Sequence, residues 1–96
     1  MRCQLIIKAP GGGIDALDHC QRHKIPVQDI KGITDYNEVI VETKELGKAE
    51  YMRIATWFCE PPLHPEPGKG FPIGTLLHYS SLHDAPTYPF GALLET

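Results

Sequence analysis

Proline and glycine divide this chain into short segments, and their placement limits which helices and strands it can form. Pro10 is followed by three glycines, Pro26 follows Ile25, and residues 61–74 contain five prolines and three glycines. Proline lacks the backbone N–H that a helix interior or a central strand needs, and glycine favours turns. We therefore expect regular structure between these positions and a long loop over 61–74.

The segments between these positions have strand-like and helix-like patterns. Branched and apolar side chains predict strands over residues 3–9, 27–33, 38–43 and 75–81. Apolar residues at helical spacing predict a helix over about 14–24, with an apolar side that includes Ile14, Leu17 and Cys20. A second helix is predicted from Thr43, as its N-cap, to about Cys59, with a buried face of Tyr51, Ile54, Ala55 and Phe58.

The order of these segments, β-α-β-β-α-β, predicts an α+β domain with the ferredoxin-like arrangement, in which both helices cover one face of the sheet. The strands at 3–9 and 38–43 would lie centrally. Alternation predicts that Leu5, Ile7, Val39 and Val41 face the helices, and that the open face has Gln4, Ile6, Lys8, Glu38, Ile40 and Glu42. The domain would span residues 1–81, and residues 82–96 would form an apolar tail that packs on the domain or on a partner.

Length and composition agree with a single small soluble domain. The chain has 96 residues, of which 42% are hydrophobic and 22% are charged, and this is ordinary globular composition. No apolar run has the roughly 18 residues of a membrane span, and Leu5 to Ile7 is too short for a secretion signal. The three cysteines are widely spaced with no C-x-x-C pair, which favours reduced thiols in the cytoplasm.

The charge pattern argues against nucleic acid as a partner, and the lack of a long apolar run argues against a membrane. The formal charge is −3, and the nine Lys and Arg residues are scattered singly along the chain. Nucleic-acid-binding proteins normally cluster such residues into a basic surface.

The glycine loop lies between a predicted strand and a predicted helix, where free backbone N–H groups can hold an anion. Asp15 and Asp18 follow in the first helical turns and offset the positive helix end. The segment 9–30 (APGGGIDALDHCQRHKIPVQDI) resembles the start of an ACT domain, a ferredoxin-like regulatory module whose first loop carries Pro-Gly and binds amino acids. Lys8 and Ala9 stand where such domains commonly have an acidic residue. The residues that this resemblance implies for ligand binding are Pro10, Gly11, Gly12 and Gly13.

Asp15, His19 and His23 are spaced four apart and form a stripe on the first predicted helix. Two histidines at this spacing can share a metal ion. Asp15 and His23 would be about 12 Å apart along the helix axis, however, and a zinc site needs three or four converging ligands. We expect a solvated polar face, with His19 and His23 as weak metal candidates only.

No pattern in the sequence predicts a catalytic set or a cofactor. Cys20 falls on the apolar side of its helix, and Cys59 falls near a helix C-terminus that disfavours a thiolate, so we expect both to be small buried hydrophobes. The segment 67–70 (PGKG) lacks the spacing of a phosphate-binding loop. The carboxylates fall at caps, turns or polar faces, whereas a catalytic pair needs burial.

Exposed aromatic and apolar side chains are the remaining candidates for binding. Leu46 and Trp57 would point away from the predicted buried face of the second helix, and aromatic and Arg side chains are enriched at interfaces. The alternative is that the loop 61–74 covers Trp57. The expected partner-binding residues are Leu46, Glu50, Arg53, Trp57, Phe71, Tyr88, Phe90, Leu93 and Leu94.

These observations predict a small non-catalytic protein-binding or regulatory module, such as an inhibitor or adaptor, that contacts a protein partner or forms a homodimer. The alternative is a ligand-sensing, ACT-like domain that binds an amino acid or a small anion at residues 10–13. A metal-dependent enzyme ranks last.

Overall fold

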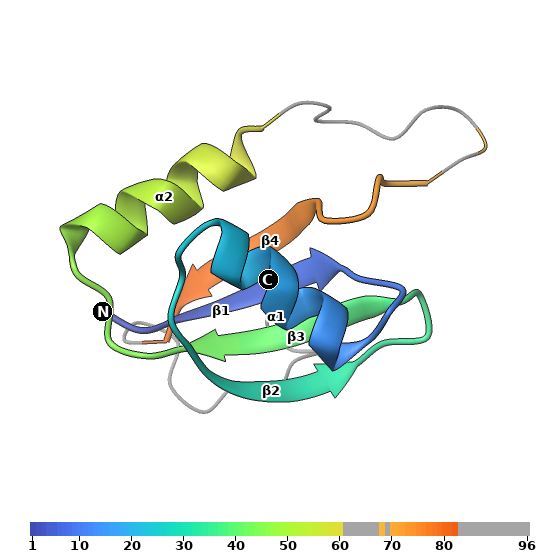
Figure 1. Cartoon of the computed structure of the whole chain (residues 1–96), viewed down its shortest axis with the longest axis horizontal. Coiled ribbons are helices and arrows are strands. Elements are labelled where there is room, and N and C mark those ends of the chain that lie inside the picture. The colour runs from blue at the N-terminus through green and yellow to red at the C-terminus, as the bar shows by residue number, and fades with distance from the viewer. Residues whose placement is uncertain (61–67, 69, 83–96) are drawn as a thin grey trace.

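Four strands and two helices make up the fold in a computed structural model, which describes residues 1–60, 68 and 70–82 (Figure 1). The α+β class is confirmed. The expectations for the rest of the loop 61–74 and for the tail, including Tyr88, Phe90, Leu93 and Leu94, lie outside the described residues. In chain order the elements are β1 (Cys3–Lys8), α1 (Gly13–Arg22), β2 (Val27–Ile33), β3 (Glu38–Thr43), α2 (Lys48–Phe58) and β4 (Leu76–Ser81).

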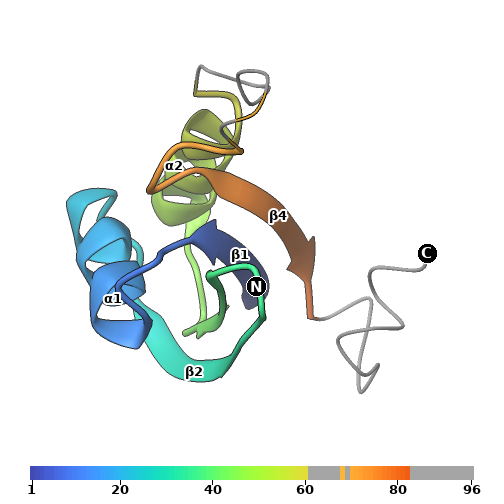
Figure 2. The ribbon, with the colours of Figure 1, turned by 90° about the vertical axis from the view of Figure 1, so that its right-hand side faces the viewer.

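The strands form one antiparallel sheet in the order β2-β3-β1-β4, so β1 and β3 are central and β2 and β4 are the edges. Ile6 lies opposite Ile40 of β3 on one side and opposite His78 of β4 on the other. The sheet is curved, and α1 and α2 lie on the same side of it (Figure 2). Neither helix is long and apolar enough to cross a membrane in the part of the chain that the structure describes.

The core lies between the two central strands and the helices. Leu5, Ile7, Val39 and Val41 are fully buried, as the alternation predicts, and they belong to one cluster with Ala16 and Cys20 of α1 and Ile54 and Trp57 of α2. The opposite face of the sheet differs from the open surface that we expected. Gln4, Ile6 and Ile40 are buried there.

Helix α1 packs through a different face from the one that its apolar pattern predicts. Ile14 and Leu17 are 84% and 41% exposed, whereas Ala16 and Cys20 are buried. Small side chains allow a helix backbone to approach the sheet closely, so the core selects alanine and cysteine over the bulkier residues. The helix also ends at Arg22 and not at Lys24, because Lys24 has a left-handed backbone with a φ of 57°.

Helix α2 begins later than the sequence predicts and is rotated. Its N-cap is Gly47, whose N–H donates to the Glu50 carboxylate at 3.4 Å. Trp57 is 3% exposed, whereas Phe58, expected in the core, is 40% exposed. Leu46 is also buried, because its backbone N–H donates to the Met1 carbonyl and draws the segment before α2 inward.

Thr43 is not the cap of α2 but the last residue of β3, where its hydroxyl links the end of β3 to the start of β1. The residue is fully buried, its Oγ1 accepts a hydrogen bond from the Cys3 N–H at 2.9 Å, and the same hydroxyl donates to the Lys44 carbonyl at 2.9 Å. This hydroxyl therefore satisfies a buried backbone donor at the start of β1.

We expect Thr43→Val to lower the free energy of unfolding by about 1–3 kcal/mol, because valine keeps the shape but leaves the Cys3 N–H without an acceptor. Chemical denaturation measures this change. Thr43→Ser keeps the hydroxyl and is the control. If Thr43→Ser and Thr43→Val lower the free energy of unfolding by the same amount, the hydrogen bond contributes nothing to stability.

Candidate functional site

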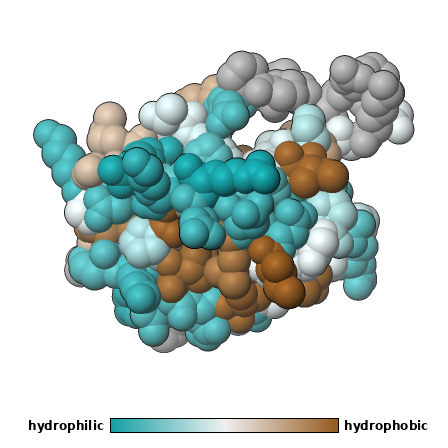
Figure 3. Space-filling model, in the orientation of Figure 1, coloured by the Kyte–Doolittle hydropathy of each residue, from teal (hydrophilic) through white to brown (hydrophobic). Residues whose placement is uncertain are grey.

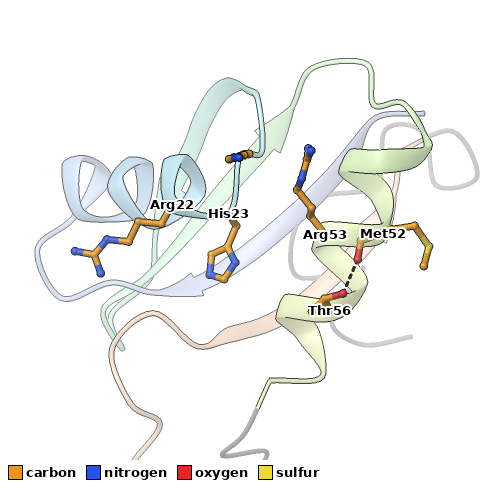
Figure 4. Close-up of a pocket in the computed structure, with 6 residues that line it drawn as sticks. Arg22, His23, Met52, Arg53 and Thr56 are labelled. Carbon is orange, nitrogen blue, oxygen red and sulfur yellow. Dashed lines mark hydrogen bonds between the residues drawn. The ribbon is translucent and has the colours of Figure 1, made fainter.

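A groove opens between the end of α1 and the outer face of α2. It has a volume of about 390 Å³, and we call it the inter-helix groove. Figure 4 shows His23 and Arg53 between the two helices, with Arg22 pointing outward along α1. The residues that line the groove are Arg22, His23 and Lys24 from α1 and the turn after it, and Met52, Arg53 and Thr56 from α2.

The inter-helix groove continues toward the start of β2 as a second, wider hollow of about 650 Å³. Lys24 and Arg53 line both parts. The second part adds apolar groups, and its other lining residues are Leu17, Gln21, Ile25, Pro26, Val27 and Glu50. The two parts together form an open channel with basic residues at its middle and apolar residues toward β2.

The groove is positively charged although the chain has a formal charge of −3. Arg22 pairs with Asp18 at 3.1 Å, and Arg53 lies 3.9 Å from Glu50. Such exposed pairs contribute roughly 0–1 kcal/mol, so they are easily exchanged for other partners. Within residues 1–60, 68 and 70–82, Lys24 has no ion-pair partner. The middle of the groove therefore has cations that are available to an anionic ligand.

Trp57 packs against His23, which lines the groove. Its indole stacks on the His23 imidazole with ring centroids 4.1 Å apart and planes 10° apart. The indole Nε1–H donates to the Gly74 carbonyl at 2.9 Å. Trp57 is thus a buried residue that fixes the position of His23. Its contact with Gly74, the last residue of the loop 61–74, agrees with the alternative that this loop covers it and not with an exposed indole.

The imidazole of His19 packs against the backbone of Gly74, in the segment that enters β4. A Cβ at residue 74 would lie 2.7 Å from the Cε1 atom of this ring, and Gly74 has a φ of 87°. His19 is only 12% exposed, and its Nε2 lies 3.2 Å from Asp15 Oδ1. The stripe of Asp15, His19 and His23 is therefore not the solvated face that we expected.

This arrangement of histidines does not form a metal centre in the part of the chain that the structure describes. No group of three or more His, Cys, Asp or Glu side chains is placed there to hold an ion. His23 faces an aromatic ring and His19 faces a glycine. The two histidines fill space between α1, α2 and the entry to β4.

Burial lowers the pKa of His23 below its usual 6.5, and the neighbouring His19 and Arg22 act in the same direction. The carboxylate of Glu60 opposes this shift and raises the pKa, but to a smaller extent than burial lowers it. The neutral imidazole is therefore the favoured form in the stack with Trp57 at neutral pH.

The cysteines do not supply a nucleophile to this site. Burial raises the pKa of the Cys20 thiol to about 12 and also raises the pKa of Cys3. Both thiols remain protonated at neutral pH and are poor nucleophiles. Cys59 is exposed, contrary to the expectation that it is buried, because α2 turns Trp57 inward and leaves its C-cap in solvent.

Two backbone N–H groups of the glycine loop before α1 already have acceptors within the protein. The Gly11 N–H donates to Asp15 Oδ2 at 3.2 Å, and the Gly12 N–H donates to the Ala9 carbonyl at 3.0 Å. A side chain of the protein therefore occupies the place that an external anion would take at residues 10–13.

The structure brings together only part of the predicted partner-binding set. Glu50 and Arg53 line the groove, Leu46 and Trp57 are buried, and Phe71 is half-buried. The sequence reasoning missed Arg22, Lys24, Met52 and Thr56, and it considered His23 only as a weak metal candidate. The consecutive basic residues Arg22, His23 and Lys24 at a helix end were a signal that points to this site.

We expect Gly74→Ala to lower the free energy of unfolding by about 2–4 kcal/mol, because alanine is strained at this φ and its Cβ displaces the His19 ring. Gly70→Ala is the matched control, since Gly70 has a φ of 70° but open space around it. Gly70→Ala should lower the free energy of unfolding by only about 1–2 kcal/mol. Equal costs in chemical denaturation would show that the His19 contact is unimportant.

We expect the stability of the protein to fall as the pH drops below about 6.5, because the unfolded state then binds a proton that His23 resists in the folded state. His23→Phe keeps an aromatic ring on Trp57, but phenylalanine cannot be protonated. The variant should therefore lose less stability than the original protein when the pH is lowered. Urea unfolding at about pH 7.5 and pH 5.5 measures both proteins. An identical loss in both would exclude His23 as a cause.

In comparisons with known proteins, no family model, no curated protein and no solved structure matches this chain.

Proposed function

We propose that this chain is a non-catalytic binding module that takes up an acidic segment of a partner protein in the inter-helix groove. The observation that supports this most directly is the position of Lys24 and Arg53. They come from separate elements, yet both line the two parts of the groove. A protein with a negative formal charge that gathers basic side chains in one hollow is suited to an anionic partner.

The shape and composition of the groove favour a peptide segment over a compact ion. Both parts are open, and apolar side chains such as Leu17, Ile25 and Met52 flank the basic ones. A segment with alternating acidic and apolar residues would place carboxylates on Lys24 and Arg53 and would bury its apolar side chains beside them. Basic side chains give orientation and fast association, whereas apolar burial adds affinity.

The chemistry of the described residues supports a binding role and not catalysis. The Cys3 and Cys20 thiols are buried with raised pKa values. The Asp15 carboxylate lies on the glycine loop, which disfavours the alternative of an amino-acid sensor at residues 10–13. We further propose a ferredoxin-like domain, supported by the strand order β2-β3-β1-β4, and a cytoplasmic location, supported by the free cysteines.

A fluorescence titration tests this function, because Trp57 is the single tryptophan and stacks on the groove residue His23. The probe is a synthetic peptide of alternating Glu and Leu, and its control is the same peptide with Lys in place of Glu. We expect saturable binding of the acidic peptide alone, and weaker binding at higher salt.

The same titration on variants identifies the site. Arg53→Gln and Lys24→Asn should each weaken binding about tenfold, since each removes one charged contact worth roughly 1–2 kcal/mol. Asparagine suits position 24 because it tolerates a left-handed backbone. Lys8→Gln, at the far end of β1, is the control with the same charge change. Equal affinity for the acidic and basic peptides, or equal effects of all three substitutions, would contradict the proposal.

A further inference from the structure

Strand β2 has a free edge on one border of the sheet, since the described strands end there in the order β2-β3-β1-β4. An edge strand offers unpaired backbone groups and side chains to another chain. Several large apolar side chains lie beside this edge. We call them the β2-edge patch, which consists of Ile14 and Leu17 of α1 and Ile30 and Ile33 of β2.

The β2-edge patch is continuous, and much of it is in solvent. Ile14 is 84% exposed, Ile33 is 58% exposed and Leu17 is 41% exposed. A Cβ at Gly12 would lie 3.8 Å from Ile33, and one at Gly13 would lie 3.8 Å from Ile30, so the start of α1 sits directly on β2. Figure 3 shows hydrophobic side chains gathered on this side of the molecule. A patch of this kind normally marks an interaction surface.

The charges along β2 indicate which partner fits the patch. Asp29 and Lys31 lie on either side of Ile30 and are 60% and 47% exposed. They pair with each other at 3.5 Å, and Lys31 also pairs with Glu42 at 3.5 Å. Such exposed pairs contribute roughly 0–1 kcal/mol, so they can exchange for partners on another chain. If two copies of β2 run antiparallel with the two Ile30 residues opposite each other, Asp29 of one copy faces Lys31 of the other, twice. The strand is thus complementary to itself under a two-fold rotation, which is the symmetry of most homodimers.

We propose that a second copy of this chain binds the β2-edge patch, with the two β2 strands antiparallel about a two-fold axis at Ile30. The register of β2 on β3 shifts between Val27 and Asp29 and again between Ile30 and Gly32. These irregularities prevent a regular backbone ladder across the edge, so side chains form most of the contact. Ile14, Leu17 and Ile33 provide its apolar part, and the two pairs of Asp29 with Lys31 fix the register.

This homodimer is separate from the proposed function, although Leu17 borders both surfaces. Arg53 lies on α2 and is not one of the residues of the β2-edge patch, so Arg53→Gln should weaken peptide binding and leave the dimer unchanged. Conversely, Ile33→Glu should dissociate the dimer and leave the affinity for the acidic peptide within about twofold. The failure of one proposal is therefore distinguishable from the failure of the other.

Analytical ultracentrifugation over a range of protein concentrations tests the dimer and its register. Asp29→Lys places lysines opposite each other across the two-fold axis, and Lys31→Asp places aspartates opposite each other. Each single variant should raise the dimer dissociation constant at least tenfold. The double variant with both changes is complementary again and should dimerise like the original protein.

A mixture of the two single variants gives the decisive result. The Asp29→Lys chain has lysine at both positions 29 and 31, and the Lys31→Asp chain has aspartate at both, so opposite charges face each other in a mixed pair. We expect two monomeric proteins to form a heterodimer on mixing. Far-UV circular dichroism checks that each variant is folded. A protein that stays monomeric at millimolar concentration would overturn the proposal, and so would a dimer that all these substitutions leave unchanged.

Discussion

The position of the Trp57 ring determines how the two helices and the last strand fit together. One face of the indole stacks on His23 at the end of α1, while its N–H bonds the Gly74 carbonyl before β4. A single buried side chain of α2 therefore contacts two segments that are distant in the sequence. The close approach of His19 to Gly74 depends on the same arrangement. The inter-helix groove is what remains open in front of this packed layer.

The strands were more predictable than the helices for a physical reason. The predicted bounds of β2 and β3 coincide with the observed ones, because Pro26 and the polar turn at 34–37 limit both segments sharply. A strand has only two faces, so the alternation of Leu5 and Ile7 was enough to identify the core side. A helix can rotate continuously, and small residues such as Ala16 can replace bulky ones at the contact. The apolar pattern alone therefore misplaced Ile14, Leu17 and Phe58.

The candidate site was less predictable because its residues come from different elements. Lys24 and Arg53 are far apart in the sequence, and although Arg22, His23 and Lys24 are consecutive, nothing in the sequence indicated that Arg53 lies beside them. Their meeting depends on the angle at which α2 crosses the end of α1, which the stack of Trp57 on His23 fixes. Glu50 and Arg53 were predicted as binding residues for a different reason, namely their place beside a tryptophan that the structure buries.

The backbone at Lys24 has a consequence for how this protein can change over evolution. A left-handed conformation costs a lysine roughly 1–2 kcal/mol, and glycine would adopt it without that cost. Glycine at this position would make the fold more stable and would remove a cation from the groove. Under the proposed function, selection for stability and selection for an anionic partner act in opposite directions on residue 24. Retention of a lysine here in related chains would be a sign that binding prevails over stability.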